Sequence, residues 1–257
     1  MVRSGMRAAS VYFQTMGDVL SLDLEHKAAA LRQFLGAAVR EHGRVVYASS
    51  LGAEAMVLTD IIATHLPEID IFSIDTGRLP EETYELLARL DTRYGARIRL
   101  VYPDSMGLQA LVSAQGINGF QGSVGARMSC CQARKVEPFK RAIEGFRAWV
   151  TGVRREQSPL RAQGNAEVWD AEYGLYKLSP LLDWTEAQIW QYIHARQLPY
   201  NALHDRRYPS IGCAPCTRSV EPGEDWRSGR WWWEESQARE CGLHPGVRHA
   251  QVAGVSR

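Results

Sequence analysis

"RVVYASSLGAEAMVLTDIIATHL", residues 44–66, decides the fold of this chain. Its first part is a short run of β-branched and aromatic residues, which predicts a strand, and the remainder returns to the helical period. The loop between them carries Ser49, Ser50 and Gly52. A loop with hydroxyls and glycine at a helix N-terminus is a natural anion site, so we expect these residues to bind an anion. It is not a Walker loop, because no Gly-Lys-Ser/Thr follows.

Strand and helix patterns alternate on both sides of this unit. The predicted strands cover residues 44–50, 69–75, 97–103 and 148–153, and the predicted helices cover 26–43, 51–66, 80–95, 136–146 and 185–196. The helix at 136–146 is expected to start further back, near residue 130. This alternation implies βαβ units with right-handed crossovers. We therefore expect an α/β fold, a Rossmann-like parallel sheet with helices on both faces, and ligands beyond the carboxyl ends of the strands.

The 257 residues, 45% hydrophobic and 23% charged, suit one large α/β domain with extensions. We predict an N-terminal arm over residues 1–22, a main domain over 23–225 and a flexible C-terminal tail over 226–257. Past residue 200 the periodic pattern gives way to Pro, Gly, Arg and Trp. This composition favours loops over further helices or strands.

Charge and targeting signals narrow the class of protein. Lys plus Arg is 30 against 29 for Asp plus Glu, so we expect no nucleic acid or membrane partner. No apolar run approaches the ~20 residues of a membrane span, and the first residues lack the apolar core of a secretory signal. Five cysteines without such a signal argue for reduced thiols in the cytoplasm. Residues 127–161 carry a local basic excess, which suits a compact anionic ligand or an ordinary solvated face.

Four of the five cysteines form two close pairs, Cys130 with Cys131 and Cys213 with Cys216. Neighbouring cysteines are poor disulfide partners, because the small ring strains the peptide bond between them. A CxxC turn lets two thiolates converge on one metal, and four thiolates suit zinc or an iron–sulfur cluster. Zinc commonly takes two CxxC turns, so the adjacent pair favours iron–sulfur. The alternative is an inert buried pair plus a redox dithiol.

The remaining candidates lie in two polar loops and the C-terminal region. "TGVRREQSPLRAQ" supplies Arg154, Arg155 and Arg161, for which phosphate contacts are a suitable use. "EDWRSGRWWW" supplies Arg227 and Arg230, which could hold a small oxyanion, followed by three tryptophans expected to be packing anchors. "RECGLH" places Cys241 in a polar, glycine-rich segment, where exposure favours reactivity, although an incidental tail cysteine is the alternative.

Together these motifs resemble those of the adenylyl-sulfate (APS) and phosphoadenylyl-sulfate (PAPS) reductase family of assimilatory sulfate reduction. The similarity runs from about residue 40 to residue 244 and is carried by "SSLGAE", "IDTGRLPEETY", "CCQARKVEP", "TGVRREQS", "CAPCTR", "GEDWRSGRWWW" and "ECGLH". The resemblance implies a fold of the PP-loop, or adenine nucleotide alpha hydrolase, type. The doubled cysteines are the mark of its iron–sulfur branch, which uses APS, whereas the branch that uses PAPS typically lacks them.

The resemblance also implies roles for individual residues. The sugar-phosphate would sit at Ser49, Ser50 and Gly52, the adenine near Ile74, Asp75, Thr76, Gly77 and Gly152, the phosphate at the loop arginines Arg154, Arg155 and Arg161, and the sulfate at Lys135, Arg227 and Arg230. Cys130, Cys131, Cys213 and Cys216 would hold a [4Fe-4S] cluster. Cys241, in the motif that contains His244, would attack the sulfur and form an S-sulfonate. Thioredoxin, or a glutaredoxin-like reductant, would then release sulfite, and a homo-oligomer is left open.

Three alternatives remain at this point. One is a PAPS reductase that has kept a cluster, and another is an ATP pyrophosphatase-type enzyme of the same fold. The loops of the latter usually read Ser-Gly-Gly-x-Asp-Ser, which this chain lacks. The third is a zinc-stabilised binding module without catalytic function. One departure from the family pattern is Ala55, where an acidic residue is often found.

Overall fold

The computed structural model describes residues 20–157 and 159–234. Six strands form one sheet in the order β3-β2-β1-β4-β6-β5. The strands are β1 (Val45–Ala48), β2 (Asp70–Ile74), β3 (Ile98–Val101), β4 (Ala148–Val150), β5 (Glu167–Asp170) and β6 (Leu175–Leu178). All neighbours pair in parallel except β5, which is antiparallel to β6 at one edge. The predicted α/β fold is confirmed, with the correction that the sheet is mixed.

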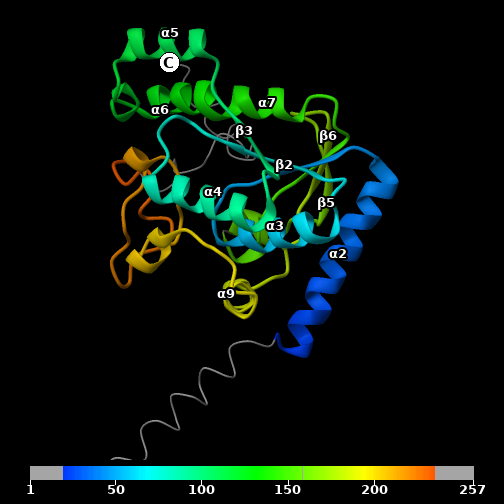
Figure 1. The fold of residues 1–257 in the computed structure, drawn as a ribbon. Helices are drawn as coiled ribbons and strands as arrows, with labels where there is room; N and C mark the ends of the chain where they lie inside the picture. Colours follow the sequence, from blue (N-terminus) through cyan, green and yellow to red (C-terminus); the bar gives the residue numbers. More distant parts are fainter. Residues whose placement is uncertain (1–19, 158, 235–257) are drawn as a thin grey trace, which may run out of the picture.

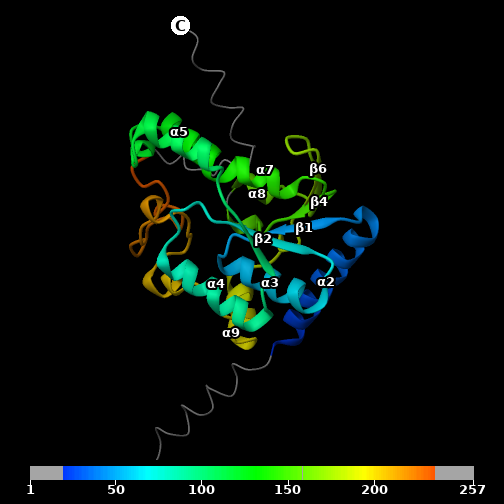
Figure 2. The same ribbon diagram turned by 45° about the horizontal axis from the view of Figure 1, so that its top comes forward.

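Helices cover both faces of the sheet (Figures 1 and 2). They are α2 (Leu22–His42), α3 (Ala53–His65), α4 (Glu81–Tyr94), α5 (Ser105–Gln115), α6 (Val124–Cys131), α7 (Glu137–Ile143), α8 (Pro159–Ala162) and α9 (Glu186–Ala195). Helices α3, α4 and α9 lie on one side of the sheet, and α5, α6 and α7 lie on the other. None of the described helices is long and apolar enough to cross a membrane.

The strand order creates a topological switch point between β1 and β4. From β1 the chain adds β2 and β3 on one side, and it then returns to place β4 on the other. The loops that follow β1 and β4 therefore diverge at the carboxyl edge of the sheet and leave a crevice there, which is where open α/β sheets bind ligands. The sequence "SSLGAE" follows β1 and "TGVRREQS" follows β4.

Helix α3 is the most deeply buried helix around the crevice. Asp60 on this helix is 3% exposed and accepts hydrogen bonds from Tyr94 Oη at 2.7 Å and Tyr192 Oη at 2.8 Å. These bonds join α3 to α4 and α9, because each tyrosine comes from one of those helices. A buried carboxylate satisfied in this way fixes the helix that begins at the anion loop.

The segment that follows β6 and α9 packs on the body of the protein. Trp231 is 1% exposed, and the guanidinium of Arg127 lies 4.7 Å from the centre of its indole ring. Arg127 Nε also pairs with Glu234 Oε1 at 2.7 Å, with both side chains 3% exposed. Residues 226–234, which the sequence placed with the tail, are thus part of the packed structure. The prediction of a tryptophan packing anchor is confirmed for Trp231.

Candidate active site

A cavity of about 260 Å³ lies at the carboxyl ends of β1, β2 and β4, at the switch point. Its lining contains ten of the residues that the sequence singled out: Ser49, Ser50, Gly52, Ile74, Thr76, Lys135, Gly152, Arg161, Arg227 and Arg230. These residues come from segments spread over almost 200 positions of the chain, and the fold brings them to one place. Asp75, Gly77, Arg154 and Arg155 do not line this cavity.

The first loop presents polar groups to the cavity. Ser49 is 5% exposed, its backbone N–H donates to Phe72 O at 2.8 Å, and its Oγ makes no hydrogen bond with the described residues. Gly52 caps α3 without a side-chain hydrogen bond, so the first backbone N–H groups of the helix face the crevice. Leu51, which directly precedes Gly52, has φ +59°, a left-handed conformation uncommon for leucine. An anion at this loop would satisfy both the hydroxyl and the helix N-terminus.

A hydrogen-bond network positions Arg161 at the cavity. Arg161 Nη1 donates to Gln157 Oε1 at 2.5 Å, and Gln157 Nε2 donates to Glu54 Oε1 at 3.0 Å. Arg154 Nε donates to the same carboxylate oxygen at 2.8 Å. Gly152 leaves room for this packing, because a Cβ there would lie 3.1 Å from Glu54 Cβ. The loop after β4 is therefore held against the start of α3, and Arg154 acts within that contact.

Arg155 points elsewhere. Its Nε donates to Asp183 Oδ1 at 2.6 Å, and its Nη1 donates to the carbonyls of Ala162 at 2.8 Å and Gly164 at 2.6 Å. These contacts close the loop that leads from β4 to β5. Of the three loop arginines, the structure brings Arg161 to the cavity, whereas Arg154 forms an ion pair with Glu54 on α3 and Arg155 with Asp183 after β6.

The second loop of the cavity, which follows β2, takes its shape from Asp75. Its Oδ1 accepts from the backbone N–H of Gly77 at 2.8 Å and from Tyr84 Oη at 2.9 Å. Gly77 has φ +70°, which side-chain-bearing residues rarely adopt. Burial, together with the hydrogen bond to Asp75, raises the pKa of Tyr84 to about 12. Asp75 and Gly77 thus set the loop conformation, while Ile74 and Thr76 face the cavity.

The four cysteines of the predicted metal site meet beside this cavity. A small cavity of about 20 Å³ is lined by Cys130, Cys131, Cys213 and Cys216, together with Phe120, Arg127, Arg134, Lys135, Arg230 and Trp231. The four sulfurs form no disulfide. Thr76 Oγ1 lies 3.2 Å from Cys213 Sγ, and the N–H of Ala214 donates to Arg78 O at 2.8 Å. The loop that follows β2 is therefore attached to the cysteine turn.

The spacing of the sulfurs fits a cluster better than a single zinc ion. No three of the four Sγ atoms lie within 4.8 Å of one another, since no cysteine belongs to such a group of ligand atoms among the described residues. Tetrahedral zinc with Zn–S bonds near 2.3 Å would need sulfurs about 3.8 Å apart. A larger group with several metal atoms tolerates the wider spacing.

The surroundings of the thiols also favour an anionic group. Burial raises the pKa of Cys216 to about 12 and raises that of Cys130, so thiolates here require positive charge to compensate them. Arg134 is 6% exposed and donates from Nη1 to Thr76 O at 2.6 Å, while its buried Nε has no hydrogen-bond partner among the described residues. That N–H is a donor available to a sulfur of a bound group.

Lys135 and Arg230 line both cavities. Lys135 lies in a π-helical turn, Gln132–Val136, which directly follows Cys131 and interrupts the helix predicted from the cysteine pair to residue 146. The wider turn differs from the single α-helical turn expected between Cys131 and Lys135, and such turns occur frequently at functional sites. Arg230 packs against Gly212, where a Cβ would lie 2.2 Å from Nη2. Two cationic residues are thus shared by the cysteine cavity and the larger cavity.

Several lining residues were missed by sequence reasoning. Thr151, Gln157, His204, Ser210 and Trp226 also face the larger cavity. Thr151 and Gln157 lie inside the motif that was recognised for its arginines, so the motif itself was the signal. Trp226 likewise lies inside "EDWRSGRWWW", the motif that supplied Arg227 and Arg230. His204 and Ser210 come from the region after residue 200, where no periodic pattern indicated how the chain would fold.

Three further sequence observations have different outcomes. Ala55 is 1% exposed and packs within the apolar core. The position where the family often has an acidic residue is therefore part of the core in this chain. Cys241 and His244, the predicted nucleophile and its neighbour, lie outside the described residues. Their roles stay predictions.

Comparisons with known proteins identify the family of this chain. The profile of the family described as "Phosphoadenosine phosphosulfate reductase domain" matches residues 44–219. A curated relative from Allochromatium vinosum, named adenosine 5'-phosphosulfate reductase, is 51% identical over 226 residues, 88% of each chain. A relative of the same name from Burkholderia cepacia is 48% identical over 225 residues, 88% of this chain and 90% of the other.

Solved structures give the same fold. A phosphoadenylyl-sulfate (PAPS) reductase from Candida auris, in a phosphate complex, has a TM-score of 0.64 and 25% identity over 79% of this chain and 98% of that one. The FMN adenylyltransferase of Candida glabrata has a TM-score of 0.52 at 14% identity, covering 88% of this chain and 80% of the other. The latter likeness concerns the fold alone.

Proposed function

This chain belongs to the phosphoadenosine phosphosulfate reductase family, and we propose that it reduces adenylyl sulfate (APS) to sulfite and AMP with thioredoxin as the reductant. One observation carries the proposal: Lys135 and Arg230 line both the larger cavity and the cavity that contains the four cysteines. This arrangement supplies cations where a sulfate would lie next to a thiolate-bound group. It also places the four cysteines next to the cavity in which the substrate would bind.

APS is favoured over PAPS as the substrate by the pattern of similarity. The relatives at 51% and 48% identity are both named adenosine 5'-phosphosulfate reductases, whereas the solved PAPS reductase is 25% identical. The four cysteines point the same way through their resemblance to the iron–sulfur branch of the family. PAPS remains the second candidate, and competition between the two nucleotides distinguishes them.

The binding roles follow from the lining of the larger cavity. Ser49, Ser50 and the N-terminus of α3 would bind the phosphate end of the nucleotide, because this loop offers an unsatisfied hydroxyl and helix N–H groups. Arg161 would add a guanidinium to the same anion. The adenosine would lie against the second loop, at Ile74 and Thr76, which line the cavity.

The sulfate end requires more positive charge than the nucleotide. We place it at Lys135, Arg227 and Arg230, which line the same cavity. The sulfur atom is surrounded by anionic oxygens, so cations must offset the repulsion of an incoming thiolate. Preorganised cations do this at little cost during the reaction, because they are already fixed by the fold.

Cys241 would perform the chemical step as a thiolate. Its sulfur attacks the sulfur of APS, the bond between that sulfur and the phosphate oxygen breaks, and AMP leaves with the electron pair. The product on the protein is a Cys241 S-sulfonate. A thiolate of thioredoxin then attacks Cys241 Sγ and expels sulfite, and its second thiol resolves the mixed disulfide to return Cys241 as thiolate. The two electrons thus come from the thioredoxin dithiol, and we place the reaction in the cytoplasm, where thiols stay reduced.

Cys130, Cys131, Cys213 and Cys216 would hold a [4Fe-4S] cluster, consistent with their wide spacing and with the available N–H of Arg134. When bound, this group supplies a fixed electrostatic and structural element beside the sulfate rather than the electrons. Arg134 and Lys135 would keep the buried thiolates compensated, and Lys135 would also face the sulfate. The contact of Thr76 with Cys213 would fix the loop after β2 relative to the cysteines.

The test is sulfite release by the cluster-loaded protein with thioredoxin, measured with APS and with PAPS. We expect turnover with APS, at least a hundredfold lower kcat/KM with PAPS, and strong loss in Lys135→Ala. Lys140→Ala, which removes a half-exposed lysine of α7, is the matched control and should behave as wild type. Turnover with PAPS alone would change the substrate. Release of pyrophosphate from ATP without sulfite would contradict the proposal in favour of the pyrophosphatase alternative.

Metal analysis tests the cysteine site separately. Iron and acid-labile sulfide in equal amounts, lost together in Cys213→Ser, are expected for a cluster. Zinc without sulfide would favour the alternative of a zinc-stabilised module.

A further inference from the structure

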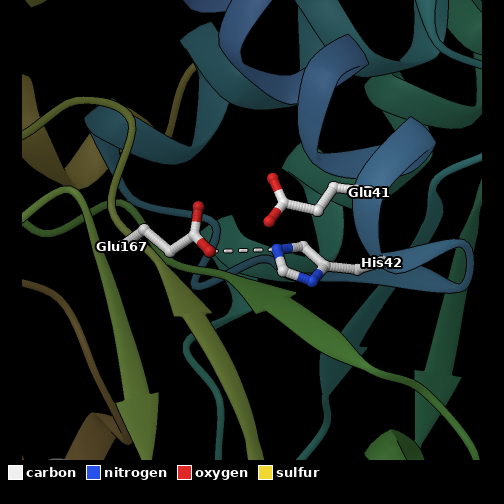
Figure 3. Close-up of side chains that lie close together, drawn as sticks. All are labelled: Glu41, His42 and Glu167. Carbon is white, nitrogen blue, oxygen red and sulfur yellow. Dashed lines mark hydrogen bonds and ion pairs between the residues drawn. The ribbon is translucent and has the colours of Figure 1, made fainter.

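A second group of metal-ligand side chains lies at the junction of α2 and β5. Glu41 and His42 are the last two residues of α2, and Glu167 is the first residue of β5 (Figure 3). One ligand atom from each side chain lies within 4.8 Å of the other two, and this is the one such group among the described residues. None of the three residues lines the larger cavity or the cysteine cavity. The group is therefore separate from the proposed reductase site.

His42 is held in position for ligation. Its side chain is 6% exposed, and its ring stacks on Tyr176 with centroids 4.5 Å apart and an angle of 27° between the planes. Nε2 faces the carboxylates and lies 3.1 Å from Glu167 Oε1. A buried imidazole with a fixed ring plane loses little freedom on binding a metal, and an orienting contact of this kind is typical of metal-binding histidines.

Glu41 is left without a partner in this group. It makes no hydrogen bond or ion pair with any residue that the structure describes, yet its carboxylate points toward His42 and Glu167 (Figure 3). A ring nitrogen donates at most one proton, and Glu167 already takes the short contact with Nε2. The C-terminus of α2 adds partial negative charge at the same place. The group therefore has negative charge that its own side chains do not balance.

We propose that Glu41, His42 and Glu167 bind a zinc ion, with water as the fourth ligand. Zinc binds imidazole nitrogen at about 2.0–2.1 Å and carboxylate oxygen at about 2.0–2.2 Å, which places tetrahedral ligands about 3.4 Å apart. The 3.1 Å separation of Nε2 and Oε1 is close to that distance. Magnesium and calcium prefer shells made of oxygen alone, so a nitrogen ligand with two carboxylates favours zinc.

The ion would join the end of α2 to the edge strand β5. β5 pairs with one neighbour only, β6, and α2 covers the sheet next to it. Binding to the folded state stabilises it by mass action, so zinc would raise the melting temperature of the protein. The site is thus structural rather than catalytic, and sulfite release is not expected to depend on it.

The test adds one equivalent of zinc chloride to the cluster-loaded protein and examines the zinc by X-ray absorption at its own edge, which iron does not obscure. We expect a first shell of nitrogen and oxygen near 2.0 Å with imidazole scattering. In calorimetric titrations, Glu41→Gln and His42→Gln should each weaken zinc binding at least tenfold. His65→Gln, which replaces an exposed histidine in the last turn of α3, is the matched control and should bind as wild type.

Three results would overturn the proposal. One is sulfur near 2.3 Å in the zinc shell, which would assign the ion to cysteines. Another is equal zinc affinity in the wild type and in Glu41→Gln, a surface variant that leaves the packing of His42 intact. The third is a melting temperature that rises with zinc to the same extent in Glu41→Gln as in His65→Gln. None of these readouts uses reductase activity, so the zinc site and the proposed function can fail independently.

Discussion

Replacing Gly212 by alanine tests whether the position of Arg230, and not only its charge, supports the reaction. A Cβ at residue 212 would lie 2.2 Å from Arg230 Nη2 and 2.6 Å from Cζ, whereas ordinary contact begins at 3.4 Å. The guanidinium would therefore have to move by about 1 Å, which is the difference between these distances. The backbone of Gly212 does not require glycine, because its φ is not positive. The atoms that must move are the end of a flexible side chain, so the fold should tolerate the change.

The expected effect is on turnover. A displacement of about 1 Å in a charged group at a reacting centre costs about a hundredfold, or about 2.7 kcal/mol of transition-state stabilisation. We expect kcat/KM for APS to fall by that factor in Gly212→Ala, with iron content and melting temperature close to those of the wild type. Gly125→Ala is the control, because its nearest side-chain atom, Ser123 Oγ, is 3.9 Å from the added Cβ. A kcat/KM within threefold of the wild type in Gly212→Ala would refute this reasoning.

Three further predictions concern other parts of the site. Gln157→Leu removes this acceptor of Arg161, so KM for APS should rise about tenfold with a smaller change in kcat; an unchanged KM would contradict this. Glu234→Ala leaves Arg127 buried without this carboxylate and should lower the free energy of unfolding by about 3–5 kcal/mol in denaturant titrations, whereas a loss below about 1 kcal/mol would show that the pair is dispensable. Burial lowers the pKa of His204, so below about pH 6.5 the unfolded state binds more protons than the folded state, and the free energy of unfolding falls on acidification. His204→Gln should make the free energy of unfolding less dependent on pH between pH 7.5 and 5. The same pH dependence in the variant and the wild type would count against this prediction.

The central strands and the first loop followed from the sequence because their patterns are local. β1 to β4 are short apolar runs followed by helical periods, and each is present where that pattern predicted it. The β5–β6 hairpin was not predicted, because its strands, Glu-Val-Trp-Asp and Leu-Tyr-Lys-Leu, have only four residues each and do not alternate apolar with polar residues. The helix α5 was also missed: none of its residues is fully buried, and its apolar face consists of only Leu108, Leu111 and Val112, which are partly buried.

Those parts of the candidate site that depend on residue type and spacing could be predicted from the sequence. The orientations of individual side chains, which depend on the folded structure, could not. The convergence of the four cysteines was expected from their spacing, and the structure places them around one cavity. The separate orientations of Arg154, Arg155 and Arg161 were not, because three arginines within one loop look equivalent until Glu54 and Asp183 are placed by the fold. The π-helical turn before Glu137 likewise has no sequence pattern of its own.

The most direct test of the proposed reaction is the intact mass of the cluster-loaded protein after mixing with APS in the absence of any reductant. The proposed mechanism stops at the Cys241 S-sulfonate under these conditions, because no thiol is present to release sulfite. We predict a gain of one SO₃ group with APS, no gain with PAPS, and no gain with either nucleotide in Cys241→Ser. An unmodified mass with APS, on protein shown to contain its iron and sulfide, would contradict the account.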